Sequence, residues 1–132
     1  MKIGDTANST KKIRREDVIK FSALTLDSNP IHYDEDYASS TRFTKCIAQG
    51  PMISSLIGGV LGSKLPGNGT IYLSQNLKFL KPVFIGDEVT ASVEIIDKKA
   101  DKPIYTLKTS VKNQHDELVI DGEAVVLFIN ED

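Results

Sequence analysis

The chain has 132 residues, of which 40% are hydrophobic and 26% are charged. This is the composition of a folded globular protein and argues against a disordered chain. The length favours one domain spanning residues 1–132, and the formal net charge of −2, with no basic stripe, argues against nucleic acid or an anionic membrane as a partner.

The sequence also indicates in which cellular compartment the protein resides. The one cysteine, Cys46, cannot form an internal disulfide, which fits a reducing environment. Residues 1–5 lack the apolar segment of a signal peptide, and the longest apolar run, residues 124–129, is far too short to span a membrane. We therefore expect a soluble cytoplasmic protein that does not associate with membranes.

The first half of the chain has helical spacing. Val18, Phe21, Ser22 and Leu24 fall near the helical period and predict a helix over residues 15–25. Asp34 resembles the N-cap of a further, short helical turn.

A longer helix is predicted to begin at Gly50. Apolar pairs recur there every four residues, and Pro51 stands in the first turn, where the amide hydrogen that it lacks would have no partner. Glycine and serine fill the other positions, and no charged residue appears before Lys64. We expect this helix to be buried nearly all round.

The second half of the chain alternates with a period of two, which is typical of strands. Turn residues and charged loops separate four runs, which predict strands over residues 70–80, 89–95, 105–111 and 118–129. Because the connections are short, we expect consecutive strands to be antiparallel neighbours. One apolar sheet face and one apolar helix bury each other when the sheet wraps around the helix. The predicted fold is therefore α+β, a single hotdog domain with an antiparallel sheet around a central apolar helix.

The segment from Asp27 to His32 places a carboxylate and an imidazole five residues apart around an Asn-Pro turn. These side chains carry out general acid–base chemistry near neutral pH without a metal. The other histidine, His115, lies in a polar run that is typical of a loop. The restricted backbone at Asn29 and Pro30 would hold the two groups in place. The spacing alone also allows a simpler interpretation, in which Asp27 caps a turn and His32 packs or meets a backbone carbonyl.

The order of motifs along nearly the whole chain resembles the MaoC-like (R)-specific enoyl-CoA hydratases, which include enzymes that feed polyhydroxyalkanoate synthesis. The segments that carry this resemblance are residues 3–5, 16–21, 24–32, 47–52, 65–73, 79–83 and 86–89. Two positions depart from the family's usual pattern. This chain has Leu26 where the family usually has glycine, and Gln49 where it usually has histidine.

The resemblance implies a set of roles in the hydration of a trans-2-enoyl-CoA thioester. Ionised Asp27 would accept a proton from water, and His32 would hold the same water and help to deliver a proton to the α-carbon. The backbone N–H of Gly50 would bind the thioester oxygen at the start of the buried helix. Asn29 and Gln49 are the candidate substrate-binding residues, and Asn29 would also anchor the loop through its amide. No metal or other cofactor is expected.

Other functions remain open at this stage. The same fold supports acyl-CoA thioesterases, although these would not need the Asp-x-Asn-Pro-x-His turn. A non-catalytic module that binds acyl-CoA is a further alternative, which the departures at Leu26 and Gln49 permit. Without the resemblance, Gly50 is simply a glycine at the entry to a helix. An exposed sheet edge and an open groove predict a homodimer, and the family implies an acyl-CoA tunnel near its interface.

Overall fold

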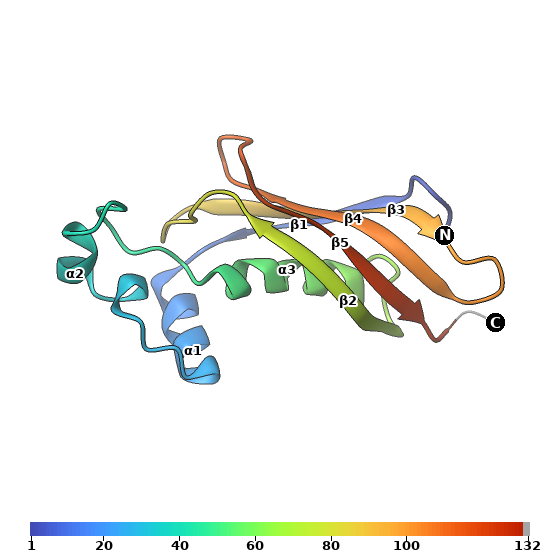
Figure 1. Cartoon of the computed structure of the whole chain (residues 1–132), viewed down its shortest axis with the longest axis horizontal. Coiled ribbons are helices and arrows are strands. Elements are labelled where there is room, and N and C mark those ends of the chain that lie inside the picture. The colour runs from blue at the N-terminus through green and yellow to red at the C-terminus, as the bar shows by residue number, and fades with distance from the viewer. Residues whose placement is uncertain (131–132) are drawn as a thin grey trace.

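Five antiparallel strands form one sheet, and the longest helix lies across one of its faces (Figure 1). This computed structural model describes residues 1–130. The strands are β1 (Thr6–Lys12), β2 (Thr70–Phe79), β3 (Glu88–Lys98), β4 (Ile104–Lys112) and β5 (Leu118–Phe128). The helices are α1 (Arg15–Thr25), the 3-10 turn η1 (Pro30–His32), α2 (Glu35–Ser39) and α3 (Gly50–Ser63). The predicted α+β architecture, a sheet around an apolar helix, is confirmed.

Helix α3 and the sheet bury each other. The buried side chains of the helix are Met52, Ile53, Ile57, Val60 and Leu61. They meet the inner face of the sheet, where alternate residues of the three central strands are buried: Val89, Ala91, Val93, Ile95, Tyr105, Leu107, Val111, Ile120, Ala124 and Val126. The period of two in β3 and β4 therefore follows from burial on one side only.

One predicted pairing is wrong. Strands β3, β4 and β5 are consecutive neighbours as expected, but the sheet order is β1-β3-β4-β5-β2, so β2 pairs with β5 and not with β3. The connection over residues 80–87 is long enough to cross two intervening strands, because each adds only about 4.8 Å. Along this crossing, the Val83 side chain joins the core. The assumption that a short connection keeps strands adjacent fails here.

One strand is missing from the prediction. Strand β1 pairs along its whole length with β3 at an edge of the sheet, yet its sequence Thr-Ala-Asn-Ser-Thr-Lys-Lys has a single aliphatic residue, Ala7. None of its side chains is fully buried, so the strand depends on backbone pairing and carries no apolar alternation. The alternation predicted for β2 is also interrupted, because the register shifts between Tyr72 and Ser74.

Helix α3 is less buried than predicted. Pro51, Ser55, Gly59 and Ser63 are exposed and recur every four residues, so they form one stripe along the helix. The expectation that this helix is buried nearly all round is therefore wrong for the single chain. The stripe consists of small residues, which explains why the sequence showed no polar face.

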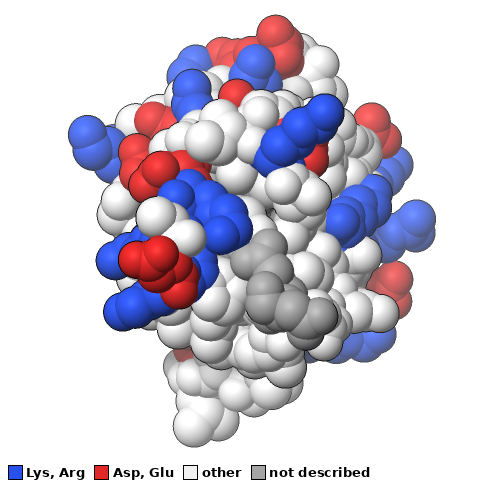
Figure 2. Space-filling model, turned by 90° about the vertical axis from the view of Figure 1, so that its right-hand side faces the viewer, with Lys and Arg blue, Asp and Glu red and all other residues white. Residues whose placement is uncertain are grey.

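The remaining helices lie together beyond one end of the sheet, beside the start of α3 (Figure 1). At the opposite end, Lys, Arg, Asp and Glu are interspersed and no patch of one sign dominates the view (Figure 2). Over residues 1–130, none of the helices is both long and apolar enough to cross a bilayer.

The central position of α3 predicts a large stability loss when its core side chain is shortened. Ile57 is fully buried, so Ile57→Ala is expected to lower the free energy of unfolding by about 2–5 kcal/mol. Urea denaturation measures this change. Lys20→Ala on the exposed side of α1 is the control and should change the free energy by less than about 0.5 kcal/mol. A loss below 1 kcal/mol for Ile57→Ala would contradict the proposed core.

Candidate active site

The turn between α1 and η1 is built by its own polar groups. The Asn29 side-chain oxygen accepts from the Ile31 amide at 3.3 Å and caps η1, and Pro30 occupies the first position of that turn. The backbone N–H of Asn29 donates to Asp27 Oδ1 at 3.0 Å. The Asp27 carboxylate thus keeps one oxygen on the turn and has its other oxygen, Oδ2, available.

The His32 ring is held by a backbone carbonyl. Its Nδ1 lies 2.8 Å from the Ile47 carbonyl oxygen, which can only accept, so Nδ1 carries a proton. In the neutral imidazole, Nε2 is then an acceptor. The His32 side chain is 10% exposed, whereas that of Asp27 is 41% exposed. The ring is therefore fixed, with one lone pair in a defined direction.

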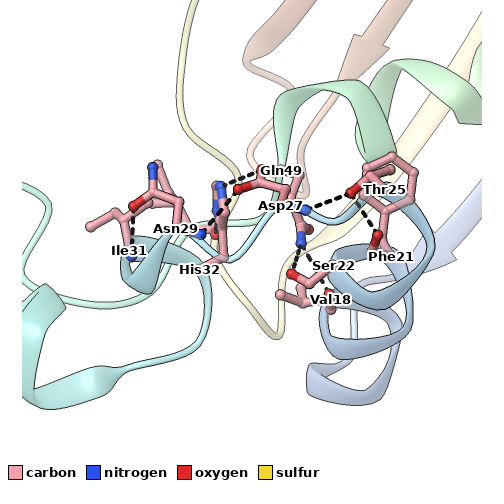
Figure 3. A network of polar contacts seen from close by, with 10 residues as sticks. Val18, Phe21, Ser22, Thr25, Asp27, Asn29, Ile31, His32 and Gln49 are labelled. Atoms are coloured by element: carbon pink, nitrogen blue, oxygen red, sulfur yellow. Dashed lines mark hydrogen bonds and ion pairs between the residues drawn. The ribbon is translucent and has the colours of Figure 1, made fainter.

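That lone pair faces the carboxylate. His32 Nε2 and Asp27 Oδ2 are 3.4 Å apart, and Figure 3 shows the two groups side by side. Both atoms are acceptors when the ring is neutral. A single water molecule can donate one hydrogen to each, so the pair is suited to hold water. The simpler interpretation of each residue is realised at the same time, because Asp27 caps the turn through Oδ1 and His32 meets a carbonyl through Nδ1.

The residues from Ile47 to Gly50 link this pair to the start of α3. The Ile47 amide donates to the Ile31 carbonyl at 3.2 Å, and the Ala48 amide donates to the Val83 carbonyl at 2.7 Å. Gly50 is the first residue of α3, so its amide has no partner within the helix and lies at the positive end of the helix dipole. One short segment therefore orients His32 at its first residue and presents a free amide at its last.

A cleft of about 290 Å³ opens beside this segment. Its wall includes Ile47, Gly50 and the Phe79 ring, and Arg42 and Lys81 also line it. A Cβ atom on Gly50 would lie 2.9 Å from the Phe79 ring, so glycine permits the close approach there. Asp27 and His32 do not line this cleft, and Ile47 is the residue that both features share.

Gln49 is buried, with 1% of its surface exposed. Its Nε2 donates to the Val18 carbonyl at 3.0 Å and to Ser22 Oγ at 2.8 Å, both in α1 (Figure 3). The side chain predicted to touch substrate is thus engaged with a neighbouring helix. Contact of Gln49 or Asn29 with substrate stays a prediction.

Two contributors to this site were missed at the level of sequence. The carbonyl of Ile47 and the carbonyl of Val18 each hold a site side chain. A backbone carbonyl belongs to every residue, so no residue type marks either position. Ser22 was noted only as part of the spacing of the first helix.

Cys46 does not offer an alternative nucleophile. Burial, with the nearby Glu35 carboxylate, raises the pKa of the Cys46 thiol to about 11. The thiol is therefore protonated at neutral pH, and the thiolate is the reactive form.

Comparison with known proteins places this geometry in a family. Residues 2–117 match the MaoC like domain. The chain belongs to the MaoC-like family. It is 45% identical to the (R)-specific enoyl-CoA hydratase of Aeromonas caviae over 96% of this chain and 94% of the relative.

Solved structures agree on the fold. The structure described as the (R)-hydratase from A. caviae involved in PHA biosynthesis superposes with a TM-score of 0.95 at 44% identity and covers 97% of each chain. The R-hydratase PhaJ1 from Pseudomonas aeruginosa gives a TM-score of 0.93 at 38% identity, over 97% of this chain and 82% of that one. The hotdog fold predicted for this MaoC-like chain is confirmed.

The departure at Leu26 has a structural consequence. Leu26 follows the last residue of α1, has φ of 64° and is 88% exposed. A left-handed backbone costs a side-chain-bearing residue about 1–2 kcal/mol, and the glycine that the resemblance led us to expect there would avoid this strain. Leu26 thus keeps the turn before Asp27 in the conformation that a glycine would adopt more easily.

Replacement of this residue by glycine should therefore be tolerated. We expect Leu26→Gly to raise the free energy of unfolding by up to about 1 kcal/mol, because the relief of strain exceeds the added chain entropy. Ala23→Gly, three residues earlier in α1 and also exposed, is the matched control and should destabilise by about 0.5–1 kcal/mol. Thermal unfolding compares the two. Equal destabilisation by both substitutions would refute the strain at Leu26.

Proposed function

We propose that this MaoC-like protein is an (R)-specific enoyl-CoA hydratase, which adds water across a trans-2-enoyl-CoA and, in reverse, dehydrates a 3-hydroxyacyl-CoA. The observation that carries the proposal is the pair of acceptors 3.4 Å apart, Asp27 Oδ2 and His32 Nε2, with the His32 ring held by Ile47, three residues before the free amide of Gly50. Close relatives named as (R)-specific enoyl-CoA hydratases support this activity and its stereochemistry.

The reaction places three demands on the site. A water oxygen must bond to the β-carbon, a proton must reach the α-carbon, and the thioester oxygen must carry negative charge as an enolate in between. In the proposed mechanism, Asp27 takes a proton from the water as its oxygen attacks. His32 holds the same water through the Nε2 lone pair, then takes over the proton from Asp27 Oδ2, 3.4 Å away, and delivers it to the α-carbon. The product gains one hydroxyl and one hydrogen, so the site returns to its starting state.

The amide of Gly50 supplies the third requirement. It donates to the thioester oxygen as charge develops there, and the dipole of α3 favours that charge. Loss of one such donor typically costs about 2.7–4 kcal/mol of activation free energy. The carbonyl oxygen would reach this amide from the cleft that Gly50 lines.

The two acceptors are expected to be essential for hydration. Asp27→Asn removes the carboxylate and His32→Ala removes the imidazole, and each should lower kcat about 10²–10⁴-fold on crotonyl-CoA, the range for loss of general acid–base catalysis. The decline of enoyl-thioester absorbance measures the rate. His115→Ala, which changes the exposed loop histidine, is the control and should keep the wild-type rate.

Product analysis separates hydration from the alternatives. Release of free thiol without a 3-hydroxyacyl product would indicate a thioesterase. Binding of enoyl-CoA with no turnover would indicate a binding module. Near-normal rates in folded Asp27→Asn and His32→Ala variants would overturn the roles given to both residues.

We further propose that the protein acts in the cytoplasm on acyl-CoA as a homodimer. Strand β2 is an edge of the sheet, and an unpaired edge favours pairing with a second chain. Exposed apolar side chains gather on this strand and just after it: Ile71, Tyr72, Leu73, Phe79 and Leu80. The exposed small-residue stripe of α3 adds a surface that permits close packing of another chain. A second copy would cover both surfaces.

A charge on β2 should weaken this assembly. Leu73 is 50% exposed, and Leu73→Lys is expected to shift the protein towards the monomer in light scattering and to lower activity, because an unpaired charge would be buried in the interface. Ile96→Lys on β3, where Ile96 is 37% exposed, is the control and should leave the dimer intact. A monomeric wild-type protein with full activity would contradict the proposal.

A further inference from the structure

Gln49 connects two parts of the chain that have separate roles in the proposed reaction: helix α1, which leads to Asp27, and the start of α3 at Gly50. Its side chain reaches from the residue before α3 to α1, where Nε2 has two acceptors, the Val18 carbonyl and Ser22 Oγ. Helix α1 then ends at Thr25 and leads through Leu26 to Asp27. The bonds of Gln49 therefore end on the helix that leads into Asp27.

Helix α1 has few other attachments near its end. Val18 is its one fully buried residue, and Leu24 and Leu26 are largely exposed. Phe21 is partly buried against the core. The two bonds from Gln49 thus add directional contacts to a helix that apolar burial holds only at Val18 and Phe21.

At its other end, Gln49 belongs to the peptide unit that carries the Gly50 N–H. Its backbone is extended, with φ of −63° and ψ of 129°, and its carbonyl oxygen accepts from the amides of Met52 and Ile53. Because the side chain is held by α1 and the carbonyl by α3, the direction of the Gly50 N–H is determined from both sides.

We propose that Gln49 is a positioning residue that sets the placement of the Gly50 amide relative to Asp27 and His32. This inference rests on the proposed hydration and goes beyond it, because Gln49 acts through its neighbours without contact with the reacting atoms.

The orientation of the amide group supports this role. The Val18 carbonyl can only accept, so Nε2 must face α1 and the group cannot flip. Gln49 Oε1 is then buried without a hydrogen-bond partner among residues 1–130. A buried, unpaired acceptor lowers stability. The Gln49 side chain therefore donates two hydrogen bonds to α1 but lowers the stability of the fold through its unpaired oxygen. This is expected of a side chain whose role is to position its neighbours.

The decisive variant is Gln49→Met. Methionine has a similar length, fills the space, and removes both the donor and the unpaired oxygen. The melting temperature should change little, because methionine removes the unpaired Oε1 while the Val18 carbonyl, which loses the Gln49 donor, keeps its acceptor role within helix α1. The kcat on crotonyl-CoA should fall about 10–100-fold, since small misplacement of a catalytic group is costly, while KM changes by less than about 3-fold.

Two further variants test the donor itself. Gln49→His keeps an N–H that can be directed at α1 and should hold kcat within about 5-fold of wild type. Ser22→Ala removes one of the two acceptors and leaves the bond to the Val18 carbonyl, so its kcat should fall, but by less than that of Gln49→Met.

The outcomes distinguish this inference from the proposed function. The wild-type enzyme is assayed first, and absence of hydration would refute the function itself. Wild-type kcat in Gln49→Met, or a fall in kcat that follows a lower melting temperature, would overturn the positioning role. Amide NMR spectra give a readout independent of activity. In Gln49→Met the signals of Gly50 and Asp27 should shift or broaden while those of β4 stay in place, and unchanged Gly50 and Asp27 signals would also overturn the inference.

Discussion

The site depends on one hydrogen bond, from His32 Nδ1 to the carbonyl of Ile47. Because the carbonyl can only accept, this bond fixes which nitrogen carries the proton and which keeps its lone pair. The lone pair of Nε2 then faces Asp27 Oδ2, and two acceptors at 3.4 Å have no proton to share between themselves when the ring is neutral. They are arranged to accept from a third group, and water is the group that the proposed reaction requires. A different tautomer would turn the same two residues into an ordinary donor and acceptor pair.

The short segment from Ile47 to Gly50 connects the core to the chemistry. Its Ala48 amide is bonded to the crossing that brings the chain from β2 to β3, and its last residue begins the helix that the sheet encloses. The fold thus determines where the free amide of Gly50 lies. The Ile47 carbonyl, in the same segment, then fixes the position of His32 relative to this amide. Asp27 is attached from the other side, at the end of α1, and Gln49 is the polar contact that joins α1 to the segment. This explains how a 41% exposed carboxylate can keep a defined place in the site.

Much of this could be predicted from sequence, for physical reasons that also mark the limits. The period of two in β3 and β4 and the four-residue recurrence in α3 reflect burial on one side, so both elements were predictable. Strand β1 is held by backbone pairing, which leaves no apolar pattern in its sequence. The crossing from β2 to β3 depends only on the length of the connection over residues 80–87, which leaves no apolar pattern either. The spacing around the Asn-Pro turn singled out Asp27 and His32 as candidates, and the resemblance to the MaoC-like hydratases implied that they act together. The tautomer of His32 and the attachment of Gln49 depend on the carbonyls of Ile47 and Val18, which no residue type can signal.

The most direct test of the central claim is a double-mutant cycle for hydration of crotonyl-CoA. If Asp27 and His32 hold one water together, loss of either group already disables it. The double variant Asp27→Asn/His32→Ala should then have a kcat within about 3-fold of the slower single variant, because residues that act as a unit are strongly non-additive. If the two losses multiply, the residues act independently. That result would contradict the shared water on which this account of the site is built.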